Sequence, residues 1–190
     1  MRLYLTKYSS EIAGHRDPPR LTMTDATDAN AKAPTERIVT RDAARGAVAR
    51  VIEQARHNLL VFAPVLDAHL FNSVEAGAAL AAFIARHHDN RARFVVGDGH
   101  QALRDNPRLV ALARRFPDAL SLRHVGEDHR NLRELMVIAD HRGYFHLENV
   151  ERLDGRLAIE APQAAATLMK RFHEIWDRSE PLTGLHPLGL

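Results

Sequence analysis

A short, uninterrupted run of apolar residues constrains the fold of this chain more than any other feature of its sequence. Residues 59–63 read LLVFA, and Pro64 ends the run. A strand whose consecutive residues are all apolar has no face suited to water, so it is buried on both sides. The run therefore predicts a central strand in a sheet that is covered by helices on each face.

Helical patterns alternate with further strands around this run. Thr40 has the side chain of a helix N-cap and precedes apolar residues at helical spacing, and residues 72–75 have the form of a capping box. Pro107 and Pro162 are suited to the first turn of two later helices. Apolar segments at residues 93–96 and 119–124 predict two more strands. Strands that alternate with helices in this way form parallel βαβ units.

The second half of the chain predicts strands that follow one another directly. These segments are residues 134–139, 144–146 and 156–159, and turn residues separate them. Consecutive strands joined by turns pair in an antiparallel or mixed manner. We therefore predict an α/β fold, a three-layer α/β/α sandwich around a mixed, mostly parallel sheet.

The two ends of the chain lack such patterns. We interpret residues 1–36 as a disordered N-terminal segment with the true translation start at Met23, residues 37–180 as the domain, and residues 181–190 as a C-terminal tail. The first segment lacks the features of a signal peptide, and no stretch approaches the ~20 apolar residues of a membrane helix. Together with the absence of cysteine, this predicts a cytoplasmic protein with no membrane partner.

The charge balance argues against a nucleic-acid partner. The chain has 26 Lys and Arg against 24 Asp and Glu. The first 22 residues contain four of the cations and two of the acids, so the remainder is neutral. Nucleic-acid binding is an alternative only if the fold aligns five arginines in one stripe: Arg86, Arg91, Arg93, Arg114 and Arg115.

One short motif resembles a dinucleotide-binding turn and another resembles a metal site, but the neighbouring residues in the sequence do not favour either function. Residues 97–102, GDGHQA, match a dinucleotide fingerprint, but the helix-start signals lie later, at residues 105–107, so we interpret the motif as a loop. His87 and His88 are adjacent, and adjacent side chains on a helix point about 100° apart. We therefore predict neither a cofactor nor a metal site.

The order of elements over residues 55–179 resembles one half of a phospholipase-D-like protein. In that superfamily the signature strand carries the motif H-x-K-x4-D-x6-G-S, and residues 133–140, RELMVIAD, occupy its place. Residues 157–159 and 162–176 are similar to the last strand and closing helix of the superfamily. The nearest likeness is to an uncharacterised bacterial family with a degenerate form of this fold. The resemblance implies an acetyltransferase domain as a partner or fusion.

The resemblance also implies which functional groups have been lost. Counting back from Asp140 places Arg133 at the nucleophilic histidine and Leu135 at the phosphate-binding lysine. A guanidinium stays protonated and cannot attack phosphorus, and leucine cannot hold an oxyanion. Active members need two such motifs facing each other, so the resemblance implies that this single half forms a homodimer. We predict that the chain has no catalytic residue.

We therefore expect a non-catalytic domain that binds a ligand or a partner. Asp67, Asp98 and Asp140 follow predicted strand ends, where ligands bind in open α/β sheets, although aspartate also caps helices and forms turns there. Arg133 can hold an anion or form an ion pair. The ligand-binding candidates are Asp67, Asp98, His124, Arg133 and Asp140. The enzyme alternative is a phosphodiesterase or nuclease that uses His124, His129 or His146.

Overall fold

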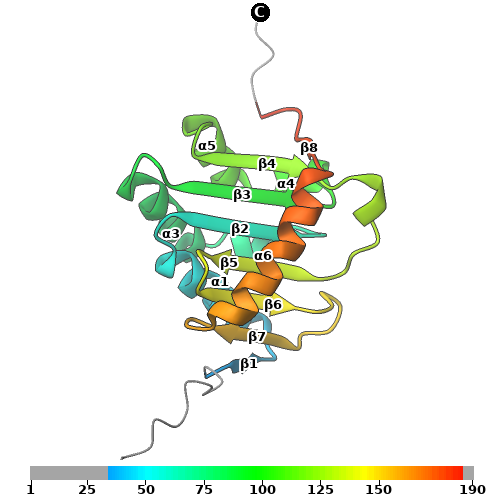
Figure 1. Ribbon diagram of the computed structural model, residues 1–190. Helices are drawn as coiled ribbons and strands as arrows, with labels where there is room; N and C mark the ends of the chain where they lie inside the picture. The colour runs from blue at the N-terminus through cyan, green and yellow to red at the C-terminus, as the bar shows by residue number, and fades with distance from the viewer. Residues whose placement is uncertain (1–33, 186–190) are drawn as a thin grey trace, which may run out of the picture. The chain divides into compact units, whose positions relative to one another are not determined.

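Eight strands form one mixed sheet in the computed structural model, which describes residues 34–185 (Figure 1). Their order across the sheet is β1-β7-β6-β5-β2-β3-β4-β8. In chain order the strands are β1 (Glu36–Ile38), β2 (Asn58–Ala63), β3 (Arg91–Val96), β4 (Leu120–His124), β5 (Leu135–Ala139), β6 (Gly143–Leu147), β7 (Gly155–Ala158) and β8 (Glu180–Pro181). The α/β class and the mixed sheet are as predicted.

The sheet is mostly antiparallel, which corrects the prediction of a mostly parallel one. Among the described strands, only the β2–β3 and β3–β4 pairs are parallel, and the other five pairs are antiparallel. The connections from β5 to β6 and from β6 to β7 are short turns, and a parallel pair needs a longer crossover. The short strands β1 and β8 add an antiparallel pair at each edge.

Helices cover both faces of the sheet, as predicted. The helices are α1 (Arg41–Gln54), α2 (Ala68–Phe71), α3 (Val74–Arg86), α4 (Gly99–Asp105), α5 (Pro107–Arg115) and α6 (Pro162–Asp177), with a 3-10 helix at Glu127–His129. In Figure 1, α6 crosses one face diagonally. The other helices pack on the opposite face, where they share a separate hydrophobic cluster with the sheet.

Strand β2 has the two-sided burial that its sequence predicts. Leu59 and Val61 pack in the cluster with α1 and α3, whereas Leu60 and Phe62 pack in the cluster with α6. All four are almost completely buried. Burying one such side chain contributes about 1.5–3 kcal/mol, so the run is a major source of stability.

The helix starts agree with the sequence in part. Thr40 caps α1 as predicted, because its hydroxyl accepts a hydrogen bond from the Ala43 N–H (3.2 Å). The capping box at residues 72–75 predicts Asn72 as the N-cap of α3, but the N-cap is Ser73, one residue later. Helix α4 begins at Gly99, inside the motif that we predicted to be a loop. Asp98 caps this helix by accepting a hydrogen bond from the Gln101 N–H (2.9 Å).

The domain extends beyond the predicted boundaries at both ends. Glu36, in the segment predicted to be disordered, begins β1, while Met23 and residues 1–33 lie outside the described residues. At the other end, the Leu182 N–H donates to the Leu122 carbonyl (3.0 Å) and Leu185 is buried, so residues 181–185 belong to the domain. Over the described part of the chain, no helix has the length and apolar character needed to cross a membrane.

Candidate functional site

Four of the five predicted site residues lie along one edge of the sheet. Asp67 follows β2, Asp98 follows β3 and His124 ends β4, so all three are at the carboxyl ends of the parallel strands. Strand β5 runs opposite to β2, which brings Arg133, just before β5, to the same edge. Asp140, just after β5, lies at the opposite edge. We call the edge that holds Asp67, Asp98, His124 and Arg133 the carboxyl edge.

Asp140 has a structural role that separates it from the other candidates. Its Oδ2 accepts a hydrogen bond from the backbone N–H of Arg56 (2.8 Å), and its Oδ1 accepts from those of His57 and Asn58 (2.9 Å each). Its φ of 53° is the only positive value among the described non-glycine residues. Asp140 therefore fastens the turn after β5 to the start of β2, away from the carboxyl edge.

Asp67 and Asp98 are helix caps at the carboxyl edge. The Asp67 Oδ1 accepts from the His69 N–H (2.8 Å) as the cap of α2, and its Oδ2 pairs with the Arg41 guanidinium. Asp98 caps α4 in the same manner. Both carboxylates thus perform the capping role that the sequence favours for each aspartate taken singly.

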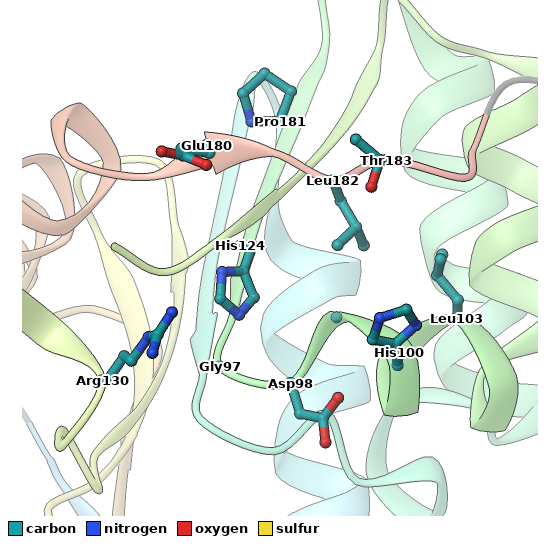
Figure 2. A pocket seen from close by; sticks show the side chains of 11 residues that line it. Gly97, Asp98, His100, Leu103, His124, Arg130, Glu180, Pro181, Leu182 and Thr183 are labelled. Carbon is teal, nitrogen blue, oxygen red and sulfur yellow. The ribbon is translucent and has the colours of Figure 1, made fainter. Parts of the chain in front are cut away.

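Asp98 and His124 line a first cavity, of about 610 Å³, at the ends of β3 and β4. Figure 2 shows the Arg130 guanidinium pointing toward the His124 ring, with His100 on the other side of the cavity. The lining also includes the carboxylates of Asp98 and Glu180. Because Arg130 is the only arginine or lysine against these two acids, and it also pairs with Glu127, the first cavity is poorly suited to a phosphate group.

A second cavity, of about 420 Å³, lies between the end of β2 and the carboxyl-edge ends of β5 and β6. Val65 and Leu153 in its wall are 46% and 36% exposed. Two ion pairs border it, Arg41–Asp67 and Arg133–Glu151. The full lining is Arg41, Val65, Asp67, Leu70, Leu135, Leu147, Val150, Glu151 and Leu153. Six of these nine side chains are apolar.

The two positions compared with the signature motif border this second cavity. The guanidinium of Arg133 pairs with Glu151, which lines the cavity. Leu135 also lines it and is only 1% exposed. A paired guanidinium and a buried leucine offer neither a nucleophile nor a cation for phosphate oxygens.

The three histidines of the enzyme alternative do not form one site. His124 is on β4 and His146 on β6, and the three strands between them imply a separation of about 19 Å. The His146 Nε2 lies 3.4 Å from a carboxylate oxygen of Glu134. Hydrogen bonds from His146 and Arg171 lower the pKa of Glu134. His129 is in the 3-10 helix, and its Nδ1 is buried without a hydrogen-bond partner.

The five arginines of the nucleic-acid alternative do not form one stripe. Arg86 donates to the Ala55 carbonyl and Arg114 to the Leu185 carbonyl, so they anchor separate segments. Arg93 instead lies with Arg123 over the ring of Trp176, with guanidinium carbons 5.6 and 4.3 Å from the ring centroid. Sequence reasoning missed Arg123, although the alternation of Leu and polar residues along 120–123 would have placed it on this face.

His87 and His88 do not lie on a helix, because α3 ends at Arg86. The angle between adjacent helical side chains therefore does not apply to them. One ligand atom from each imidazole and a carboxylate oxygen of Asp89 all lie within 4.8 Å of one another. The reason for predicting no metal site at these histidines is thus wrong.

The fold of the chain is similar to that of phospholipase D family members. Nuc from Salmonella typhimurium, a phospholipase D family member, is similar with a TM-score of 0.55 at 14% identity, covering 78% of this chain and 97% of Nuc. NucT from Helicobacter pylori is similar with a TM-score of 0.56 at 9% identity, covering 78% and 98%. At such identities the likeness shows the fold alone.

The chain belongs to the family described as a domain of unknown function, DUF7931, whose model matches residues 40–188. A further similar structure is TrmBL2, an archaeal chromatin protein with a novel mode of DNA binding. Its TM-score is 0.59 at 14% identity, and the match covers 82% of this chain but only 56% of TrmBL2. No curated protein is significantly similar to the chain in sequence.

Proposed function

We propose that the chain is a non-catalytic phospholipase-D-like domain that binds a small, largely apolar ligand in the second cavity. The observation that carries this proposal is Leu135, a buried leucine that lines the cavity where the resemblance expects the phosphate-binding lysine. Small-molecule pockets are typically apolar with a few polar groups that fix orientation, and about 420 Å³ falls within their usual range. The two bordering ion pairs would hold the polar end of such a ligand.

Binding is tested with the fluorescent probe 1-anilinonaphthalene-8-sulfonate, which joins an apolar body to one anionic group. Val65→Asp and Leu153→Asp place a charge in the cavity wall, and we expect each to weaken probe binding by about tenfold or more. Val74→Asp is the matched control, because Val74 is 66% exposed and does not line the cavity. Equal probe binding by all three variants and the unmodified protein would refute this site.

The absence of catalysis is tested with bis(p-nitrophenyl) phosphate, a generic phosphodiester. We expect no hydrolysis above the buffer rate, because an ion-paired Arg133 and a buried Leu135 replace the reactive groups. Hydrolysis that disappears in His124→Ala or His129→Ala would overturn this expectation. It would favour the alternative of a phosphodiesterase or nuclease.

A homodimer formed through the carboxyl edge is part of the proposal. Val65 and Leu153 are exposed there. Val39, which follows β1, is 53% exposed at the same edge, because the end of β1 pairs with the start of β7. Apolar side chains left in water at one edge favour its coverage by a second copy. A monomer at micromolar concentration in analytical ultracentrifugation would contradict it. The acetyltransferase partner or fusion that the family resemblance implies is also part of the proposal, as is the cytoplasmic location.

Nucleic-acid binding is a second candidate function, favoured by Arg91, Arg93 and Arg123. In Figure 1, α6 covers only part of its face of the sheet and leaves the amino-terminal halves of β3 and β4 uncovered there. The three guanidinium groups are held by backbone carbonyls or by the Trp176 ring. Among the described residues, none of the three forms an ion pair with a carboxylate. The three arginines are half-buried and have no acidic partner among the described residues, so this face keeps a positive charge that suits a phosphate backbone.

This second candidate is tested with a short fluorescein-labelled DNA duplex in anisotropy titrations at several salt concentrations. We expect Arg93→Ala combined with Arg123→Ala to weaken binding and to lower the salt slope by about 2, because each phosphate contact contributes ~0.9. Arg45→Ala on α1 is the control, since it removes a surface arginine elsewhere. A slope that does not differ between the double variant and the control would count against this surface.

A further inference from the structure

The turn that follows α3 presents three metal-ligating side chains in consecutive positions: His87, His88 and Asp89. His87 has an extended backbone (φ −155°, ψ 139°), which ends the helix and turns the chain outward. The Asn90 N–H then donates to the His87 carbonyl (3.1 Å) and closes the turn. The three side chains are all exposed to solvent.

Side-chain hydrogen bonds from Asn90 and Arg91 fix the backbone of this turn. Asn90 is completely buried, and its side-chain amide donates to the Phe83 carbonyl in the last turns of α3 (2.7 Å). The Arg91 guanidinium donates to the carbonyls of His88 (2.7 Å) and Asn90 (3.1 Å). Because both ends of the turn are held, little backbone entropy remains to be lost when a ligand binds its side chains.

The two distances from Asp89 to the imidazoles are close to those between neighbouring ligand atoms of a tetrahedral metal centre. The Asp89 Oδ2 lies 3.3 Å from the His88 Nε2 and 3.7 Å from the His87 Nδ1. Metal–ligand bonds of about 2.1 Å in tetrahedral geometry place neighbouring ligand atoms about 3.4 Å apart. The two imidazole rings already stack, with centroids 4.5 Å apart and an interplanar angle of 29°. Because an imidazole nitrogen binds a metal in the plane of its ring, the stacked side chains must rotate before both rings face one ion.

We propose that His87, His88 and Asp89 form a binding site for Zn²⁺, with the fourth position open to water. Two imidazoles and one carboxylate are ligands that zinc accepts, whereas Mg²⁺ and Ca²⁺ prefer oxygen alone. The His87 Nδ1 now accepts a hydrogen bond from the Asp89 N–H (3.2 Å), which the metal replaces. Solvent competition and the neighbouring Arg91 cation weaken the site relative to an enclosed structural zinc site.

The proposal is tested by isothermal titration of the full chain with Zn²⁺, followed by Co²⁺ absorption spectroscopy as a second readout. We expect His88→Ala and Asp89→Ala each to weaken the assigned binding step by at least about tenfold, the scale of change that even outer ligand partners produce. Co²⁺ should give visible ligand-field absorption that both variants lose. His141→Ala is the control, because His141 is an exposed histidine on the turn after β5.

Zinc affinity and stoichiometry that remain unchanged in His88→Ala and Asp89→Ala would overturn the proposal. A loss of binding in His141→Ala alone would overturn it as well, because it would place the metal at the turn after β5. Circular dichroism of each variant tests whether the fold is retained. We expect all three variants to keep the fold, because the three substituted side chains are exposed.

Discussion

Replacing Asp140 separates a structural role from a ligand-binding role at this position. Its carboxylate accepts three backbone hydrogen bonds, and its backbone has a φ of 53°. Asp140→Ala removes both acceptor oxygens, and with them three hydrogen bonds, and also leaves a Cβ in the left-handed region, which aspartate tolerates better than alanine. Asp140→Gly removes the acceptors but relieves the backbone. Asp140→Asn keeps one acceptor oxygen and the shape of the side chain.

The three substitutions have a predicted order. Each lost hydrogen bond costs ~1 kcal/mol when water can partly replace the carboxylate, so Asp140→Ala should lower the free energy of unfolding by about 3–4 kcal/mol, including the backbone cost. Asp140→Gly should cost about 1 kcal/mol less than Asp140→Ala, because glycine adopts a positive φ freely. Asp140→Asn should cost about 1–2 kcal/mol, since its amide nitrogen faces the Arg56 N–H in place of an oxygen.

Urea unfolding monitored by tryptophan fluorescence measures this series. Trp176 is the only tryptophan in the chain, and it stacks on Phe172 with centroids 5.9 Å apart, so its environment changes on unfolding. Asp140→Asn should leave probe binding in the second cavity unchanged. Wild-type stability in Asp140→Ala, or a larger loss in Asp140→Gly than in Asp140→Ala, would refute the assigned role.

Three further substitutions have defined expectations. Glu134→Gln should lower the free energy of unfolding by about 1–2 kcal/mol at neutral pH. Hydrogen bonds from His146 and Arg171 lower the pKa of Glu134 in the folded state. The contribution of Glu134 to stability is therefore complete above about pH 4.3, the ordinary glutamate pKa, and is lost as the pH falls through the lower folded-state pKa. A deficit of the same size in acid as at neutral pH would contradict this. Asn106→Ala should cost about 2–3 kcal/mol in urea unfolding, because the buried Asn106 amide donates to the Leu66 (2.9 Å) and Ala102 (3.2 Å) carbonyls; a loss below ~0.5 kcal/mol would count against it. Gly97→Ala should lower the melting temperature markedly, because a Cβ would overlap the Pro64 carbonyl oxygen and lie 3.0 Å from its carbon; an unchanged melting temperature would show that the strand ends can separate freely.

Local patterns in the sequence were sufficient for the central strand and most helices. Burial of residues 59–63 on both faces, the Thr40 cap and the first-turn Pro162 of α6 depend on residues a few positions apart. The edge strands could not be predicted in this way, because β1 has three residues and β8 has two. Both form only by pairing with strands that are distant in the sequence.

The candidate site was predictable only as a set of residue types. The sequence grouped Asp140 with the carboxyl-edge residues because Asp67, Asp98 and Asp140 each follow a predicted strand. The antiparallel direction of β5 decides otherwise, since it brings Arg133 to one edge and carries Asp140 to the other. The backbone groups that Asp140 binds are 82–84 residues away in the chain, beyond the reach of any local pattern. Periodicity determines which face of an element is buried, whereas strand direction and long-range pairing decide which side chains meet.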